Sequence, residues 1–279
     1  MVVGTDAWTR RRILDLARDY AAPREEVLMT EGRMGGAVIV GDTVRKPVRR
    51  WTPAVHDLLR HLENVGFDGA PRVLGVDDSG REILTYLPSD ARSRIDAPKS
   101  DEALVGLGRL LRDFRESVNG FEARADACWR LGKPLKAGAI TCHNDVNPGN
   151  IVYRDGKPYA LIDWDLAGPG SPLDDFVRAA ILFTPLVPDQ ICRAWGYDEI
   201  PERGHRLESL CEGYGIESGP WILDAVEALE QRDLADLLTL GRQGVSPFAS
   251  FLSSGSEEAT RRDLAWLANE RDHLERALS

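Results

Sequence analysis

The sequence predicts an α+β protein of two lobes, a small antiparallel sheet with one long helix and a larger, mainly helical part. In the first 88 of the 279 residues, short apolar or β-branched runs alternate with turn dipeptides, as in antiparallel hairpins. A polar segment with two prolines follows at 88–100, and most of the remainder has apolar residues at helical spacing. We therefore expect one lobe at 1–88 and a second at 89–279.

The strands of the first lobe are predicted from apolar runs that end at turn residues. Gly41-Asp42 and the segment 77–80 are turn sequences that would join neighbouring strands into hairpins. A glycine-rich turn occupies residues 31–36. The expected strands cover residues 27–29, 37–40, 43–46, 72–76 and 82–86.

Helices are predicted where apolar residues recur every three or four positions. The first covers about 9–20, and the second has Thr52 as its N-cap and Pro53 as its first helical residue. The buried side of this second helix, which ends before Gly66, would consist of Val55, Leu58, Leu59 and Leu62. Further helices are expected to include residues 104–114, 222–237 and 256–278, with a short β-rich insert at 139–165.

Composition narrows the classes of partner and the compartment. The 45 acidic residues outnumber the 35 basic ones, which argues against nucleic acid as a partner and favours a cationic small molecule. No apolar run approaches the ~18 residues of a membrane span, and the opening residues lack a secretory signal. We therefore expect a cytoplasmic protein that binds no membrane. The four cysteines form no CxxC pair and are expected to be buried thiols.

The richest chemical pattern lies in the β-rich insert. Two short apolar strands flank the polar loop 143–150, and a third strand ends at Asp163. Within the loop, Asp145 and Asn150 have the spacing D-x-x-x-x-N. Phosphoryl transfer needs a carboxylate that orients the attacking hydroxyl and takes its proton, together with oxygen ligands for Mg²⁺. Each residue taken alone is equally typical of a turn or a strand end, but the ordered set favours phosphoryl transfer.

The loop sequence His-Asn-Asp-Val-Asn-Pro-Gly-Asn at 143–150, followed by Ile-Asp-Trp-Asp at 162–165, resembles the aminoglycoside phosphotransferase family. That family has a protein-kinase-like fold, and its two-lobed organisation fits nearly the whole chain. Two departures are visible: Asn144 stands where the family usually has Gly, and Asn147 where it commonly has His. The resemblance implies a bilobal kinase-like fold with a nucleotide-binding first lobe and a catalytic, acceptor-binding second lobe.

The resemblance also implies roles for individual residues. Asp145 would be the catalytic base, and Asn150 and Asp163 would hold the Mg²⁺ ion that accompanies ATP or GTP. Asp175 resembles the buried family aspartate that holds the catalytic loop, although an acid near a helix N-terminus is common without such a role. His143 would order the loop rather than carry protons.

In the first lobe, the resemblance implies a strand cation that binds the nucleotide phosphates. Arg45 and Lys46 are both candidates, and because neighbouring strand residues point to opposite faces, only one of them can face the cleft. We choose Lys46 by analogy with the kinase lysine. The turn 31–36 could bring backbone N–H groups over the phosphates, or be a plain hairpin turn. The hinge that contains Thr85 and Leu87 would offer its backbone to the adenine or guanine ring.

One feature of kinases is missing from the second predicted helix. Kinases place a glutamate there that pairs with the strand cation, whereas this chain has Val55-His56-Asp57 in that region. Either Asp57 or a residue elsewhere replaces the glutamate, or the pair is absent. An absent pair would weaken the hold on the phosphates.

The leading hypothesis is a phosphotransferase that moves the γ-phosphoryl group of ATP or GTP onto a hydroxyl of a small molecule, an aminoglycoside being one possible acceptor. The alternative from another class is a catalytically weak nucleotide-binding regulator. A third hypothesis is a metal-dependent hydrolase that uses His143, Asp145 and Asp163. Candidate acceptor-binding residues, each equally typical of core packing or a solvated helix face, are Trp195, Tyr197, Glu199, Glu230 and Asp233.

Overall fold

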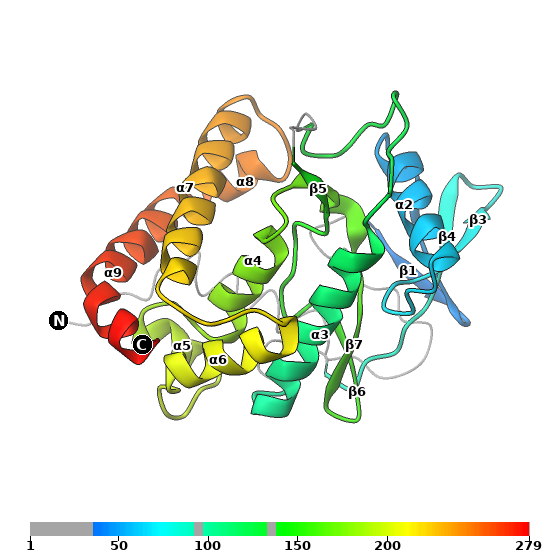
Figure 1. The fold of residues 1–279 in the computed structure, drawn as a ribbon. Helices are drawn as coiled ribbons and strands as arrows, with labels where there is room; N and C mark the ends of the chain where they lie inside the picture. Colours follow the sequence, from blue (N-terminus) through cyan, green and yellow to red (C-terminus); the bar gives the residue numbers. More distant parts are fainter. Residues whose placement is uncertain (1–35, 92–96, 133–137, 279) are drawn as a thin grey trace.

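The computed structural model of the chain describes residues 36–91, 97–132 and 138–278. A four-stranded antiparallel sheet with one helix beside it leads into a larger part made mainly of helices, which confirms the predicted α+β class (Figure 1). The predicted helix 9–20, the strand 27–29 and residues 31–35 of the glycine-rich turn lie outside the described residues.

The sheet of the first lobe has the order β1-β2-β4-β3. Its strands are β1 (Val38–Val40), β2 (Thr43–Pro47), β3 (Val73–Val76) and β4 (Arg81–Thr85), and each strand begins and ends within one residue of its predicted position. In the pairing of β2 with β4, Val44 lies opposite Leu84 and Lys46 opposite Glu82. Since side chains two apart share a face, these four residues lie on one side of the sheet.

Helix α2 (Thr52–Asn64) packs its apolar stripe into the core, and Val55, Leu58, Leu59 and Leu62 are all buried as predicted. Its N-terminus differs from the prediction. Trp51 is the N-cap, and Thr52 is the first helical residue instead of the cap. The Thr52 hydroxyl accepts a hydrogen bond from the N–H of Arg49 at 2.9 Å, outside the helix, so the local turn takes the oxygen that capping would have used.

The larger part places short strands among its helices. The β-rich insert contains β5 (Ile140–Cys142), β6 (Ile151–Arg154), β7 (Lys157–Leu161), the 3₁₀ turn η1 (Trp164–Leu166) and β8 (Gly168–Gly170). Strand β5 pairs with β8, and β6 with β7. The helices are α3 (Asp101–Ser117), α4 (Asp174–Phe183), α5 (Asp189–Ala194), α6 (Arg203–Tyr214), α7 (Trp221–Arg242), α8 (Phe248–Ser253) and α9 (Ser256–Ala277).

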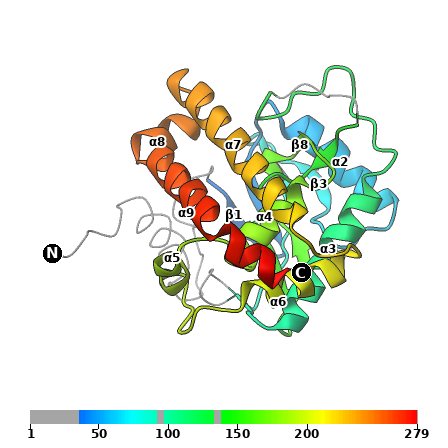
Figure 2. The same ribbon diagram turned by 60° about the vertical axis from the view of Figure 1, so that its left-hand side comes forward.

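Helices α7 and α9 lie side by side in both ribbon views, on the side of the molecule away from the sheet (Figures 1 and 2). Helices α3 and α6 approach so closely that position 213 of α6 has room only for glycine. A Cβ on Gly213 would lie 2.0 Å from the carbonyl oxygen of Val105 in α3. Among the described residues, no helix combines the length and apolar character needed to cross a bilayer.

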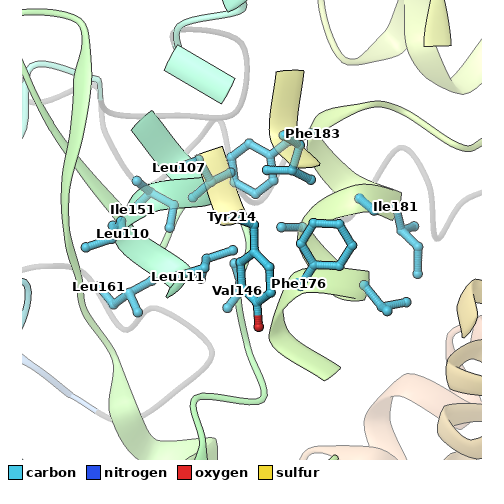
Figure 3. Close-up of a cluster of buried hydrophobic side chains, with 14 of the residues drawn as sticks. Leu107, Leu110, Leu111, Val146, Ile151, Leu161, Phe176, Ile181, Phe183 and Tyr214 are labelled. Atoms are coloured by element: carbon cyan, nitrogen blue, oxygen red, sulfur yellow. The ribbon is translucent and has the colours of Figure 1, made fainter. Parts of the chain in front are cut away.

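The hydrophobic core extends directly beneath the loop 143–150. Val146 of that loop is fully buried, and it lies among side chains of α3, α4 and β6 (Figure 3). Leu107 and Leu111 of α3 and Phe176 of α4 are almost completely buried around it. Because interiors are close-packed, this anchor fixes the position of the polar residues on either side of Val146.

Candidate active site

The loop 143–150 is attached to helix α4 through Asp175, which lies in the first turn of that helix. One carboxylate oxygen accepts the backbone N–H of His143 at 2.7 Å, and the other accepts the N–H of Asn144 at 2.8 Å. Burial raises the pKa of Asp175 to about 6. Asp175 is therefore both an acid at a helix N-terminus and the group that holds the loop, so the two interpretations of the sequence are compatible.

Asn144 has a left-handed backbone, with a φ of +63°. Glycine adopts this conformation most easily, and asparagine is among the few other residues that tolerate it. Its side-chain amide donates to the carbonyl oxygens of Leu166 and Gly168 at 3.2 and 3.1 Å. The replacement of the family's usual glycine is thus sterically tolerated, and it adds a link between the loop and the segment after Asp163.

His143 is fully buried and uses both ring nitrogens within the protein. Nε2–H donates to the carbonyl oxygen of Ile162 at 3.0 Å, and Nδ1 accepts the backbone N–H of Asp145 at 3.3 Å. The ring also packs edge-on against Trp164, with centroids 4.6 Å apart. These contacts fit a loop-ordering residue, and they leave no ring nitrogen for a metal ion.

Burial lowers the pKa of His143 from 6.5 to about 4, because the charged ring would lose its hydration. Below pH 6.5 the unfolded chain therefore binds a proton that the folded protein does not, and the stability contributed by His143 is lost as the pH falls toward 4. We expect the free energy of unfolding of the wild type, relative to a His143→Gln variant, to fall by about 3 kcal/mol between pH 7 and pH 4.

Denaturant unfolding of both proteins at several pH values measures this difference. Comparison with the variant is needed because burial raises the pKa of Asp145 and of Asp175 to about 6, which has the opposite effect on stability over the same range. Parallel stability curves for the two proteins would show that His143 is not kept neutral by the fold.

The carboxylate of Asp145 is held by two asparagine side chains. Asn147 Nδ2 donates to Oδ1 at 3.1 Å, and Asn150 Nδ2 donates to Oδ2 at 2.9 Å. Burial, together with the negative charge of Asp163, raises the pKa of Asp145 to about 6. Asn147, at the position where the family commonly has His, thus helps to orient the carboxylate.

Asn150 and Asp163 are brought together by the hairpin of β6 and β7. The N–H of Ile162 donates to the carbonyl oxygen of Asn150 at 2.9 Å, which extends the ladder of the hairpin and places Asp163 directly after the residue paired with Asn150. Asp163 itself is left-handed, with a φ of +60°. Backbone strain of this kind is concentrated at functional sites. Carboxylate and amide oxygens are the donors that Mg²⁺ prefers, so these two side chains fit that ion.

The structure places the two candidate phosphate-binding cations on opposite faces of the sheet. Lys46 Nζ lies 3.5 Å from Asp163 Oδ1 and 2.5 Å from Asp165 Oδ1. Burial opposes the charge of Lys46, but the surrounding carboxylates outweigh it and raise its pKa. Arg45 turns the other way and pairs with Asp77 at 3.4 Å. Of the two cations, only Lys46 remains a candidate for phosphate binding.

The two hinge candidates, Thr85 and Leu87, differ in whether their backbone N–H groups already form hydrogen bonds within the sheet. Thr85 is the last residue of β4, and its N–H and hydroxyl both bond to the backbone of Arg72. The N–H of Tyr86 donates to Asp42 at 2.8 Å. Thr85 therefore has no N–H to offer a nucleotide base, which leaves Leu87 as the remaining hinge candidate.

Four further polar residues lie around Lys46, and the sequence reasoning did not assign them to the site: His56, Glu82, Arg130 and Asp165. Glu82 pairs with Lys46 at 3.8 Å, and Arg130 pairs with Asp165 at 3.7 Å. A usable signal did exist in β4, because strand alternation places Glu82 on the same face as the buried Leu84. A charged residue on the buried face of a strand calls for a partner.

The acceptor-site candidates do not form one cluster. Trp195 is buried in the core, Tyr197 packs against Arg206, and Glu199 is exposed. Glu230 and Asp233 lie on α7, where Asp233 pairs at 2.8 Å with Arg178 of α4. The charge of Arg178 also acts on Asp145. Only the two acids of α7 are thus linked to the site.

Fold and site together define a phosphotransferase of the protein-kinase-like class, and comparison with known proteins identifies its family. Residues 113–207 match the family described as Phosphotransferase enzyme family (APH). The chain is also 33% identical over 197 residues to the trifolitoxin immunity protein of Rhizobium leguminosarum bv. trifolii, covering 69% of this chain and 75% of the relative. The chain belongs to this phosphotransferase family, as its loop sequence predicts.

Solved structures confirm the predicted kinase-like fold. The gentamicin complex of APH(2")-IIa has a TM-score of 0.53 and 13% identity, covering 96% of this chain and 97% of that one. ADP-bound APH(2'')-Ib has a TM-score of 0.53 and 14% identity, covering 94% and 98% of the two chains. Spectinomycin phosphotransferase APH(9)-Ia, in complex with ADP and spectinomycin, has a TM-score of 0.52 and 14% identity, covering 86% and 88%. At such low identity the likeness concerns the fold alone.

Proposed function

We propose that this protein is a Mg²⁺-dependent phosphotransferase that moves the γ-phosphoryl group of ATP or GTP onto a hydroxyl of a small molecule. The observation that carries the proposal is the convergence of Asp145, Asn150 and Asp163. Asn150 contacts the carboxylate of Asp145 through its side chain and the backbone of Ile162, next to Asp163, through its carbonyl oxygen. Lys46 comes from the other lobe to within 3.5 Å of Asp163.

In the proposed reaction, Asp145 orients the acceptor hydroxyl and takes its proton as the new oxygen–phosphorus bond forms. The bond between the γ-phosphorus and the bridging oxygen of the nucleotide breaks, and ADP or GDP leaves. The amides of Asn147 and Asn150 hold its two oxygens in place, so little reorganisation is needed when the acceptor binds. Transfer of a phosphoryl group depends mainly on positioning and on neutralising negative charge. A loop that is hydrogen-bonded to α4 through Asp175 and anchored by the buried Val146 suits the first of these needs.

Asn150 and Asp163 would hold the Mg²⁺ ion, which when bound neutralises charge on the nucleotide phosphates. Lys46 adds a second positive charge on the side of the sheet. We assign nucleotide binding to the lobe 1–88, where the backbone after Tyr86 would contact the adenine or guanine ring. We assign catalysis and acceptor binding to 89–279. We place the reaction in the cytoplasm, where ATP and GTP are available.

Two experiments test the proposal in sequence. Thermal unfolding with ATP or GTP, each with and without Mg²⁺, should show a rise in midpoint that requires the ion, since a ligand that binds only the folded state stabilises it. Phosphate transfer from both nucleotides to a panel of amino sugars, macrolides and small alcohols should then yield a phosphorylated product. If the protein bound nucleotide with Mg²⁺ but showed neither phosphate transfer nor slow nucleotide hydrolysis, the nucleotide-binding regulator would be supported instead. A rise in the unfolding midpoint with metal alone would support the hydrolase.

The relative's name favours a second, narrower proposal about the acceptor. The trifolitoxin immunity protein shares 33% identity with this chain over three quarters of its own length. We propose that the acceptor is a toxic small molecule, whose phosphorylation protects the cell. Expression in a sensitive host should raise the tolerated dose of one toxic compound, and an Asp145→Asn variant should give no protection. Equal protection by the wild type and the Asp145→Asn variant would show that immunity does not depend on phosphoryl transfer.

A further inference from the structure

Helix α2 does not supply the acidic partner that the strand lysine has in kinases. This helix contains two acids, and neither contacts the lysine. Asp57 pairs with Arg60 at 3.8 Å, and Glu63 lies 4.0 Å from Arg72. The helix therefore supplies no carboxylate of the kind that pairs with the strand lysine in kinases.

Glu82 of β4 occupies the position of such a partner. It lies directly across the strand pair from Lys46, and Oε1 is 3.8 Å from the lysine Nζ. Its side chain is only 3% exposed, enclosed between the sheet and α2. A buried carboxylate is costly unless it is paired and hydrogen-bonded, so both partners of Glu82 matter to the fold and to its charge balance.

His56 connects this carboxylate to the helix. It stands on α2 where the chain departs from the kinase pattern, it is buried, and its Nε2 lies 2.8 Å from Glu82 Oε2. Because a carboxylate oxygen accepts, the ring N–H is the donor. Helix, strand acid and lysine thus form one continuous chain of contacts.

The other two carboxylates around Lys46 lie closer to its Nζ, Asp165 at 2.5 Å and Asp163 at 3.5 Å, but each also has another positive partner. Asp163 is the proposed ligand of Mg²⁺, so its charge is shared with the ion during the reaction. Asp165 also faces Arg130, at 3.7 Å. Glu82 has Lys46 as its only cationic lysine or arginine partner within 4 Å among the described residues.

We propose that Glu82, held from helix α2 by His56, is a positioning residue that replaces the missing helix glutamate and directs Lys46 toward the nucleotide phosphates. The inference rests on the proposed function. It adds that the carboxylate paired with the lysine lies on strand β4 here, whereas in kinases it lies on the helix. The hydrogen bond from His56 to Glu82 connects helix α2 to the lysine.

The first test is a Glu82→Gln variant, which keeps the size of the side chain and removes its charge. Binding of MgATP and MgGTP is measured by calorimetry, and kcat and KM are measured for acceptor-independent nucleotide hydrolysis. We expect kcat/KM to fall about 10- to 100-fold, because the variant removes the buried negative charge that pairs with Lys46 at 3.8 Å. Asp57→Asn, a neighbouring acid of α2 that pairs with Arg60, is the matched control and should stay within about twofold of wild type.

A double-mutant cycle with Lys46→Met separates positioning from general structural damage. If Glu82 acts through Lys46, adding Glu82→Gln to Lys46→Met should cause little further loss of nucleotide affinity. Additive losses would overturn the inference. So would wild-type affinity and kcat/KM in Glu82→Gln.

Substitutions at His56 give an independent comparison should Glu82→Gln fail to fold. A His56→Gln variant can still donate an N–H to Glu82, whereas His56→Leu cannot. We expect nucleotide affinity close to wild type for the first and about 10-fold lower for the second, and equal affinities would contradict the role of His56. A wild-type protein that bound no nucleotide would overturn the proposed function itself, which distinguishes the two failures.

Discussion

An Asp145→Asn variant is expected to lose about 10²- to 10⁴-fold in kcat for phosphoryl transfer while it still binds MgATP or MgGTP. Asparagine has nearly the same shape as aspartate, but it takes no proton from the acceptor hydroxyl. The amides of Asn147 and Asn150 both donate to the native carboxylate, so an amide at this position would also meet one donor with its own NH₂ group. The loss should therefore appear in kcat with little change in nucleotide affinity.

Steady-state transfer to the acceptor found by screening, together with calorimetry of nucleotide binding, measures both quantities. Asp126→Asn is a suitable control, because Asp126 is exposed and pairs with the nearby Arg124 at 2.7 Å. Transfer at the wild-type rate by Asp145→Asn would show that another group takes the proton.

An Asp163→Asn variant is expected to lose the Mg²⁺-dependent part of nucleotide binding and to transfer phosphate at least about 100-fold more slowly. The substitution removes the one carboxylate of the proposed metal site. Asparagine tolerates the left-handed backbone at this position, where φ is +60°, so the effect should come from charge and not from strain. Without Mg²⁺, nucleotide affinity should be unchanged or higher, because a negative charge near the phosphates is gone.

Calorimetric titration of ATP and GTP with and without Mg²⁺ measures this difference directly. The chain offers a closely matched control in Asp155→Asn, since Asp155 is also left-handed, with a φ of +52°, and lies in the exposed turn between β6 and β7. Unchanged dependence on Mg²⁺ in Asp163→Asn would remove Asp163 from the proposed metal site.

Several features could be predicted from sequence because they depend on neighbours along the chain. The hairpin strands follow from turn residues such as Gly41-Asp42, and the buried stripe of α2 follows from the spacing of Val55, Leu58 and Leu62. The loop 143–150 was recognisable because its residues are close in sequence, and its family assignment is confirmed. The N-cap of α2 was wrong by one residue, because Thr52 bonds to the turn before the helix.

The backbone conformation and contacts of Asn144 could not be predicted from neighbouring residues. Its presence at the family's glycine position was visible in the sequence, but its left-handed φ and its contacts with Leu166 and Gly168 were not. Those carbonyls lie more than twenty residues further along the chain. Their approach depends on how β5 pairs with β8, a pairing that short-range patterns do not specify.

The sequence alone determined the class of the protein and indicated the loop 143–150 as its candidate catalytic loop, because both depend on short motifs and on the period of apolar residues. Strand alternation showed that Arg45 and Lys46 face opposite ways, but only the packing of α2 and the position of Asp163 decided which one points into the site. The same packing brought His56 of α2 and Glu82 of β4 together, although the two residues are 26 positions apart in the sequence. Such pairs depend on long-range packing of sheet, helix and second lobe, and no local pattern encodes that arrangement.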